Sequence, residues 1–155
     1  MISFKQFATV ASAIIVAAST VVYAAEKSPA ESAQEYRQAG FEMIRYHFGP
    51  MAGMVKGEIP FDAATFKTNA EAVATLSKFP MHGFIAGSYE GDTEAKPEIE
   101  KNMDDFKSKM ETFQVAAADL AKAAGEAKDV EGIKPAFGKT AESCKACHKE
   151  YREEK

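Results

Sequence analysis

The hydrophobic pattern of this chain has the period of an α-helix, because apolar residues return every three or four positions along most of its length. Ser28-Pro29-Ala30-Glu31 has the form of a capping box and predicts the start of the first helix, and Gly57 predicts its end. Pro50 should kink the last third of this helix, since proline removes one backbone hydrogen bond.

Two stripes of related positions run side by side along this first helix. The first stripe consists of Arg37, Phe41, Ile44, Phe48, Met51 and Val55, and the second stripe consists of Tyr36, Gly40, Met43, His47 and Met54. A helix with two such stripes can face a core on one side and a partner helix or subunit on the other. We therefore expect one stripe to be buried within the chain and the second to contact a partner.

Two further helices follow from their boundary residues and spacing. The second should begin after Asp62, a favourable N-cap, and stop at Phe79-Pro80. The third should begin at Pro97 and end before Gly125, the expected C′ residue. Its apolar positions are Ile99, Met103, Phe106, Met110, Phe113, Ala117, Leu120 and Ala124. Alternating steps of three and four are typical of the seam of a helical bundle.

The connection over residues 80–96 and a fourth helix complete the pattern. Glycines interrupt the connection, but its apolar residues, such as Phe84 and Tyr89, indicate that it folds over something buried. The fourth helix should begin at Asp129 or, with Pro135 in its first turn, near Ile133. One broad face of it carries Ile133, Phe137, Thr140, Cys144, Cys147, His148 and Tyr151. We predict an antiparallel all-α four-helix bundle, a scaffold that holds cofactors between its helices.

The first 24 residues have the form of an export signal. Lys5 is the only charged residue before Glu26, an apolar run follows it, and Val22-Tyr23-Ala24 resembles a cleavage site. The alternative is an uncleaved membrane anchor, but the apolar run is short for a spanning helix. We predict cleavage after Ala24 or Ala25, a mature domain over residues 25–155, and a periplasmic protein without membrane attachment.

The charge of the chain excludes one class of partner. The full sequence has 19 basic and 23 acidic residues, a formal charge of −4, and cleavage would remove Lys5 and leave the rest more acidic. Nucleic-acid-binding domains are usually basic, so we do not expect nucleic acid as a partner.

The chemistry of the chain is concentrated in Cys144-Lys145-Ala146-Cys147-His148. Two thiols three residues apart, followed by an imidazole, can hold haem through two thioether bonds and one axial iron ligand. On a helix these three side chains share one face, so they point at the same object. Covalent haem also fits an exported chain.

A cysteine pair with this spacing also occurs in zinc sites and in thioredoxin-like redox sites. A zinc site needs four ligands, and the only other histidines in the chain are His47 and His82. A thioredoxin-like redox pair lies where a strand meets a helix N-terminus, whereas this pair falls late in a helical pattern. Both readings are weaker than covalent haem.

Several segments together resemble the cytochrome c′ family. Besides the signal and the bundle pattern, they are Tyr36-Arg37-Gln38, Val55-Lys56-Gly57-Glu58-Ile59-Pro60-Phe61-Asp62 and Cys144-Lys145-Ala146-Cys147-His148-Lys149-Glu150-Tyr151-Arg152. Most other c-type cytochromes carry the haem motif near the N-terminus, so its position close to the C-terminus is specific. The resemblance covers nearly all of the mature chain and implies one covalently attached haem c.

The resemblance also implies roles for individual residues. Cys144 and Cys147 match the thioether cysteines, and His148 matches the proximal iron ligand. Arg152 matches a basic residue near the proximal haem face. Arg37 matches an arginine that approaches the haem propionates, where a charge-assisted hydrogen bond is reasonable.

Phe41 falls where the family places a bulky apolar residue over the vacant side of the iron. Phenylalanine has no lone pair to coordinate iron, so the haem is expected to be five-coordinate with His148 alone. Met43 is the nearest candidate for a sixth ligand, but two residues along a helix turn it about 200° away from Phe41. His47 lies on the same stripe as Met43 and is no better placed.

These features lead to a function and an alternative. Without a distal hydrogen-bond donor we expect ferrous haem to bind NO, to bind CO more weakly, and to bind O₂ poorly. The leading hypothesis is a periplasmic NO-binding protein that can also transfer one electron, and the alternative is a plain electron carrier with six-coordinate low-spin haem. No enzymatic activity is expected, since no polar distal acid–base group is indicated. In the family NO can displace the proximal histidine, and homodimers form through the first two helices, so we expect a homodimer through the second stripe.

Overall fold

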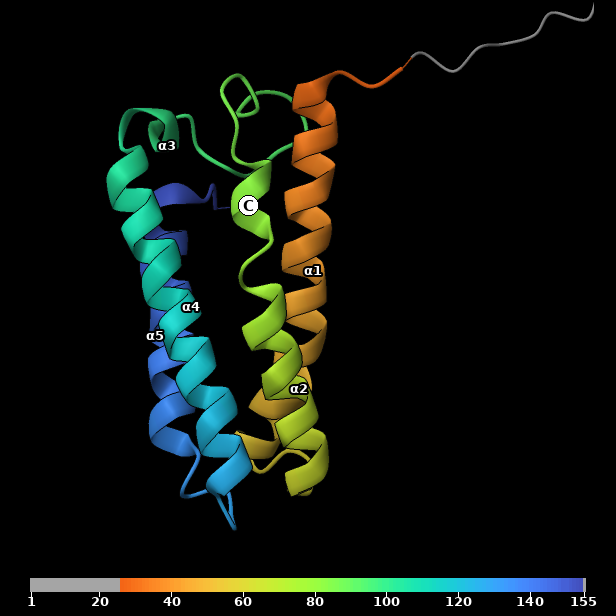
Figure 1. Cartoon of the computed structure of the whole chain (residues 1–155), viewed down its shortest axis with the longest axis vertical. Coiled ribbons are helices and arrows are strands. Elements are labelled where there is room, and N and C mark those ends of the chain that lie inside the picture. The colour runs from red at the N-terminus through yellow and green to blue at the C-terminus, as the bar shows by residue number, and fades with distance from the viewer. Residues whose placement is uncertain (1–25, 155) are drawn as a thin grey trace, which may run out of the picture.

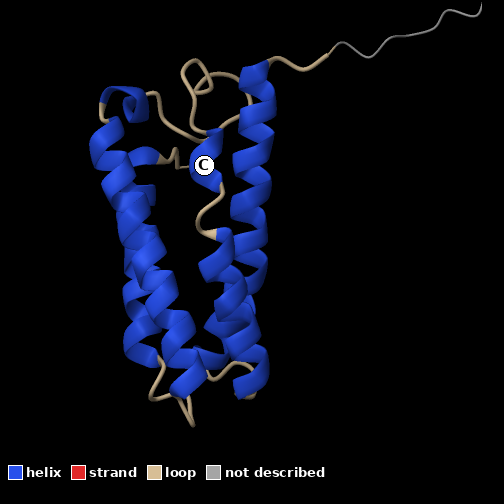
Figure 2. Ribbon diagram, in the orientation of Figure 1, coloured by secondary structure: helices blue, strands red, loops and turns tan. Residues whose placement is uncertain are grey.

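The computed structural model describes residues 26–154, so the predicted signal peptide, residues 1–24, lies outside the described residues. Its elements are α1 (Pro29–Lys56), α2 (Ala63–Leu76), a short 3₁₀ turn η1 (Pro80–Gly83), α3 (Glu98–Lys101), α4 (Met103–Glu126) and α5 (Lys134–Tyr151) (Figure 1). Over this range every regular element is a helix, and the isolated bridge between Ala95 and Arg152 is the only β-type pairing (Figure 2). The prediction of an all-α bundle is confirmed.

The ends of α1 follow from local sequence chemistry. The backbone N–H of Glu31 donates to Ser28 Oγ at 3.2 Å, and Glu31 Oε2 accepts from the Ser28 N–H at 2.7 Å, which completes the predicted capping box. Gly57 ends the helix in the left-handed region, with φ of 75°. The helix continues through Pro50, and the kink expected there stays a prediction.

The second stripe of α1 does not face a partner along its whole length. Gly40 is buried, and a Cβ atom on it would lie 3.1 Å from Cγ of Pro80, so this position packs against η1. Met54 is buried in the core, whereas Tyr36 and Met43 remain exposed. The second stripe is therefore divided between contacts inside the chain, at Gly40 and Met54, and exposed positions, at Tyr36 and Met43, and its contact with a second subunit stays a prediction.

The predicted third helix is interrupted. Asn102 has φ of −121° and ψ of 36°, which separates α3 from α4, and its side-chain amide donates to the Glu98 carbonyl at 3.1 Å. Asparagine competes in this way for backbone acceptors that a continuous helix would use. The prediction of one helix was wrong here because the step of four from Ile99 to Met103 continues the helical spacing across the break.

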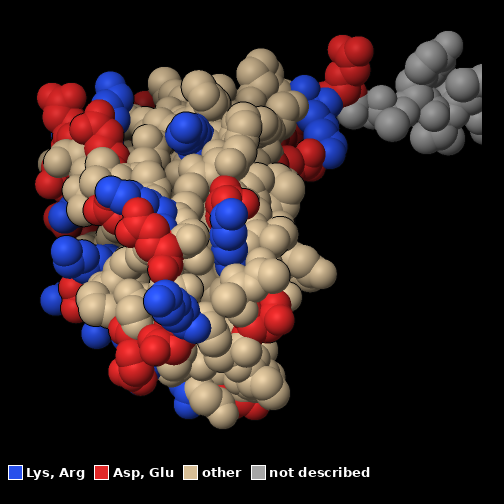
Figure 3. Space-filling view, turned by 60° about the horizontal axis from the view of Figure 1, so that its bottom comes forward, with Lys and Arg blue, Asp and Glu red and all other residues tan. Residues whose placement is uncertain are grey.

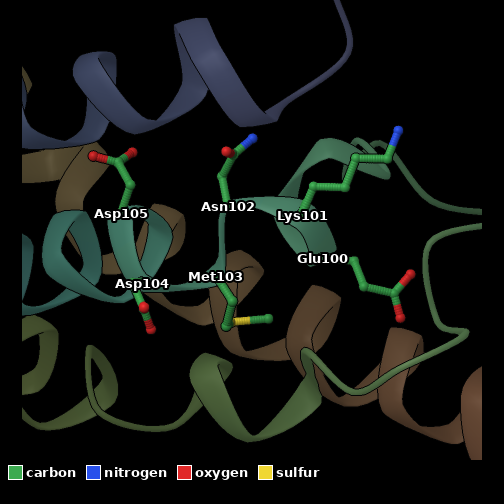
Figure 4. A pocket seen from close by; sticks show the side chains of 6 residues that line it. All are labelled: Glu100, Lys101, Asn102, Met103, Asp104 and Asp105. Carbon is green, nitrogen blue, oxygen red and sulfur yellow. The ribbon is translucent and has the colours of Figure 1, made fainter.

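A shallow depression of about 350 Å³ lies at this break. Figure 4 shows Asn102 and Asp105 extending to one side of the backbone, and Met103 and Asp104 to the other. Most of these residues are exposed and polar, so the depression is separate from the core.

The other helix ends agree with local signals except at one position. Asp62 caps α2 by accepting from the Thr65 N–H at 2.6 Å, and α5 begins at Lys134, the later of its two predicted starts. Gly125 was expected just beyond the end of α4, but it lies inside the helix, which ends at Glu126. The prediction of Gly125 as the C′ residue is wrong because Ala127 turns the chain into an extended conformation, with ψ of 139°.

The helices form an antiparallel bundle in which packing is uneven. α2 packs against α1 and α4, and α4 packs against α5, whereas α1 and α5 are not among the closely packed pairs (Figures 1 and 2). The larger core cluster lies between α1, α2, α4 and α5 and includes Ile44, Met51, Phe66, Val73, Leu120 and Phe137. A second cluster contains Phe84, Tyr89, Ile99, Phe106, Met110 and Tyr151, so the connection after η1 does fold over a buried region, as predicted.

The outer surface is mixed in charge. On the face shown in Figure 3, basic and acidic side chains are interspersed. Of the helices within residues 26–154, none combines the length and hydrophobicity required to cross a lipid bilayer.

Candidate functional site

A cavity of about 790 Å³ opens where α1 and α5 are not closely packed. That volume is within the range of small-molecule and cofactor sites. Its lining comes from α1, α4, α5 and the connection over residues 84–95. All six site residues predicted from the sequence lie on it, namely Arg37, Phe41, Cys144, Cys147, His148 and Arg152. The fold therefore brings together residues that are up to 115 positions apart in the sequence.

Helix α5 is held in a fixed rotation by a contact between Thr140 and α4, and this rotation turns the motif toward the cavity. Thr140 is fully buried, and its hydroxyl donates to the carbonyl oxygens of Ala116 in α4 at 3.1 Å and Ala136 at 3.0 Å. One turn later, Cys144 and then Cys147 are partly buried on the cavity wall. The i, i+3 spacing therefore aims both thiols into the same space.

The two thiols are not tuned for redox chemistry of the thioredoxin type. Burial raises the pKa of Cys144, and burial raises the pKa of Cys147 to about 11. Reactive redox cysteines have lowered pKa values because the thiolate is the nucleophile. In addition, residues 26–154 contain no cluster of three or more histidine, cysteine, aspartate or glutamate side chains arranged to hold a metal ion, which a zinc site would require.

His148 has the protonation state that a metal ligand needs. Burial lowers its pKa, and the positive charge of Arg152 lowers it further, while Glu94 acts in the opposite direction. Only the neutral imidazole has a lone pair for iron. His148 is therefore a suitable axial ligand, on the same wall as the thiols.

Arg37 is the most unusual charged residue of the site, since its side chain is only 2% exposed. Its guanidinium donates to the Gly83 carbonyl and to Ser88 Oγ, both at 2.7 Å, to the Ser88 carbonyl at 2.5 Å and to Thr93 Oγ1 at 2.8 Å. It also lies over the ring of Phe84, 4.8 Å from the ring centroid. These partners are neutral, and no carboxylate within residues 26–154 forms a salt bridge with Arg37.

A buried cation with neutral partners fits an anionic group in the adjacent cavity. Burial lowers the pKa of Arg37, and neutral acceptors offset only part of the cost of removing its charge from water. A haem propionate would supply the missing negative charge. With two inward-facing thiols and a neutral imidazole on the opposite wall, the residues present fit a covalent haem.

The α1 side of the cavity carries three apolar residues, Phe41, Ile44 and Phe48, among polar neighbours. Phe41 is partly buried there and packs edge-on against Phe84, with 6.2 Å between ring centroids. The structure places Met43 away from the lining, with 48% of its surface exposed. His47 also lies outside the lining, where its Nδ1 is hydrogen bonded to Asn69 Oδ1 at 2.8 Å.

Several lining residues were not predicted from the sequence to be part of the site. Phe84 and Phe106 form an aromatic pair beside Phe41, with ring centroids 4.6 Å apart. Glu94 pairs with Arg152, with 2.5 Å between Oε2 and a terminal guanidinium nitrogen. The apolar character of the connection indicated the role of Phe84, but nothing in the sequence around Glu94 indicates its partner.

Comparison with known proteins gives the same picture. The family model described as Cytochrome C′ matches residues 32–152. The structure of cytochrome c prime from Shewanella frigidimarina is 53% identical, with a TM-score of 0.78, and the match covers 83% of this chain and 99% of that one. A nitric oxide complex of a variant of the Alcaligenes xylosoxidans protein is 41% identical, with a TM-score of 0.75 and coverage of 84% and 100%. A carbon monoxide complex of another variant of that protein is 41% identical, with a TM-score of 0.73 and coverage of 81% and 97%.

Proposed function

The chain belongs to the cytochrome c′ family and therefore carries a covalently attached c-type haem, and we propose that it is a periplasmic protein that binds NO, and CO more weakly, with His148 as the only protein ligand of the iron. When bound, the haem supplies an iron whose second axial position can accept a diatomic gas. The solved NO and CO complexes of related cytochromes c prime support gas binding as the role. The export signal supports the location.

One observation carries the five-coordinate assignment. Phe41 lies on the cavity lining, whereas Met43 and His47, the two candidates for a sixth ligand on α1, lie outside it. Helix α1 therefore offers a hydrocarbon ring to the haem and no sulfur or imidazole. A sixth ligand from this helix would require α1 to rotate, which would expose the buried Ile44 and Arg37.

Met110 of α4 is a methionine on the lining and has to be considered separately. It is buried in the cluster that contains Phe106 and Ile99, so it already has apolar neighbours on several sides. Methionine in such surroundings is usually a packing residue. We assign Met110 to packing.

The same surface accounts for selectivity among gases. Bound O₂ is stabilised by a distal hydrogen-bond donor, which NO and CO need less. Phe41 and its cavity neighbours Ile44 and Phe48 have no donor groups. Arg37 has donors, but its terminal nitrogens are already engaged by the connection. We therefore expect poor O₂ binding. We also expect a binding protein rather than an enzyme, because Phe41, Ile44 and Phe48 carry no acid–base group and two charged α1 residues on the lining, Glu42 and Arg45, are paired with each other.

An optical titration of the reduced holoprotein with NO, CO and O₂ tests this function. We expect a high-spin, five-coordinate spectrum, changes with NO at low concentration, changes with CO at higher concentration, and none with O₂ beyond oxidation. A low-spin, six-coordinate spectrum without NO binding would favour the electron carrier. If a Met110→Leu variant then became five-coordinate while Met43→Leu did not, Met110 would be the ligand, and the Phe41 assignment would be wrong.

One-electron transfer remains compatible with this role, and the redox partner is a separate question. We also propose a homodimer through the exposed apolar residues on α1 and near η1, which are Tyr36, Met43, Tyr46 and Phe79. Exposed apolar clusters of this kind are common at protein interfaces. Sedimentation of the holoprotein at micromolar concentration should give the mass of two chains, and a Met43→Lys variant should sediment as a monomer. A monomer in the unmodified protein would exclude the dimer.

A further inference from the structure

The end of the connection is fastened to the C-terminal end of α5. The Lys96 N–H donates to the Tyr151 carbonyl at 3.0 Å, and the Glu153 N–H donates to the Glu94 carbonyl at 2.8 Å. These two bonds flank the antiparallel bridge between Ala95 and Arg152. We call residues 94–96 and 151–153 the clasp.

An ion pair closes the clasp. Glu94 Oε2 accepts from Arg152 Nε at 2.6 Å and lies 2.5 Å from a terminal guanidinium nitrogen, so two nitrogens of one guanidinium meet one carboxylate oxygen. The Glu94 side chain is 29% exposed, whereas the Arg152 side chain is 51% exposed. The carboxylate is thus partly shielded from water, which makes its charge effective at short range.

The clasp lies beside the axial ligand. Glu94, Ala95, His148 and Arg152 all line the cavity, and the Arg152 N–H donates to the His148 carbonyl at 3.1 Å. Both ends of the connection are also held by α1, because Arg37 donates to the Gly83 carbonyl at 2.7 Å and to Oγ1 of Thr93, next to the clasp, at 2.8 Å. The connection therefore spans the cavity from the Arg37 side to the His148 side.

The negative charge of Glu94 and the positive charge of Arg152 have opposite effects on the electrostatic potential at the iron. An uncompensated guanidinium beside His148 would draw electron density from the imidazole and favour Fe(II) over Fe(III). A carboxylate in contact with that guanidinium cancels most of its field. The reduction potential of the iron should therefore shift in opposite directions when Glu94 loses its charge and when Arg152 loses its charge.

We propose that Glu94 is a positioning residue for the proximal side of the haem: by pairing with Arg152 it neutralises the guanidinium beside His148 and so sets the iron reduction potential and the strength of the bond from His148 to iron. This inference rests on the proposed role of His148 as the axial ligand. It adds a residue and a mechanism to that role.

Spectroelectrochemical titration of the holoprotein tests the proposal. Glu94→Gln keeps a hydrogen-bond acceptor for Arg152 but removes the negative charge, so its midpoint potential should shift upward. Arg152→Gln removes the positive charge and leaves Glu94, so its midpoint potential should shift downward. Glu153→Gln is the matched control, since it makes the same change in net charge at the next clasp residue, whose side chain is in no salt bridge found within residues 26–154. Its shift should be small.

The nitrosyl spectrum supplies a second readout. Glu94→Gln should increase the fraction of the NO complex in which His148 has left the iron, because the imidazole is a weaker donor beside an unpaired guanidinium. Shifts of the same sign in both clasp variants would indicate a merely mechanical role and overturn the proposal. Equal shifts in Glu94→Gln and Glu153→Gln would overturn it as well, as an effect of net charge alone. Failure of the unmodified protein to bind NO would count against the proposed function. The midpoint potentials of the variants would still test the role of Glu94, because they do not depend on NO binding.

Discussion

Replacing Arg37 with methionine tests whether this buried cation holds the connection in place. The change keeps an unbranched apolar stem but removes the guanidinium and its four hydrogen bonds to Gly83, Ser88 and Thr93. It also removes the guanidinium from the ring of Phe84, 4.8 Å from its centroid. The acceptors on the connection would then be left without donors on the cavity wall.

The magnitude follows from two opposing effects. Hydrogen bonds from a charged donor contribute about 1.5–3 kcal/mol each, so four of them sum to about 6–12 kcal/mol. Burying the guanidinium costs several kcal/mol, and the variant no longer bears that cost. We expect a net loss of about 3–5 kcal/mol in the free energy of unfolding, a large part of the stability of a domain this size.

Urea unfolding of the ferric holoprotein, followed by far-ultraviolet circular dichroism, measures this loss. Arg45→Met is the control, because the Arg45 side chain is 78% exposed and pairs with Glu42 at the surface, so its loss should leave the stability close to that of the unmodified protein. Arg37→Lys keeps the charge without the planar set of donors and should fall between the two. A loss below about 1 kcal/mol in Arg37→Met would refute the reasoning.

Three further predictions concern the cavity and its support. Phe41→Ala should open the α1 side of the cavity and raise the association rate of CO at least tenfold by flash photolysis, and an unchanged rate would place Phe41 away from the gas path. Gly83→Ala should cost about 1–3 kcal/mol in urea unfolding, because its Cβ would lie 2.5 Å from the backbone oxygen of Ala33, and wild-type stability would contradict that close packing. Replacing both Cys144 and Cys147 with alanine should abolish haem staining of the denatured chain on a gel, and retained staining would exclude thioether attachment.

Some features could be predicted because they depend on neighbouring residues alone. The capping box at Ser28, the N-cap at Asp62 and the left-handed Gly57 are satisfied within three or four residues, so the sequence contains all the groups involved. The motif from Cys144 to His148 is of the same kind, because helical spacing alone places its three functional side chains on one face.

Predictions failed where two local preferences competed. The apolar spacing favoured one helix through Asn102, and the side chain of Asn102 prevailed by bonding the carbonyl of Glu98. Gly125 was expected to end α4, but the chain leaves the helix at Ala127 instead. Spacing and single-residue preference do not show which of two such tendencies is stronger.

The sequence by itself determined most of the helical segments and the haem-binding motif, and the family resemblance indicated Phe41, which lies on the cavity lining. Only the tertiary structure decided what Arg37 and Arg152 bind, since their partners lie 46–58 residues away, on a connection that has no repeating pattern. A periodic pattern reports which face of a helix is buried, because the face with most of the apolar residues is the one removed from water. The pairing of two charges depends on where separate segments meet, and that is set by the packing of the whole bundle.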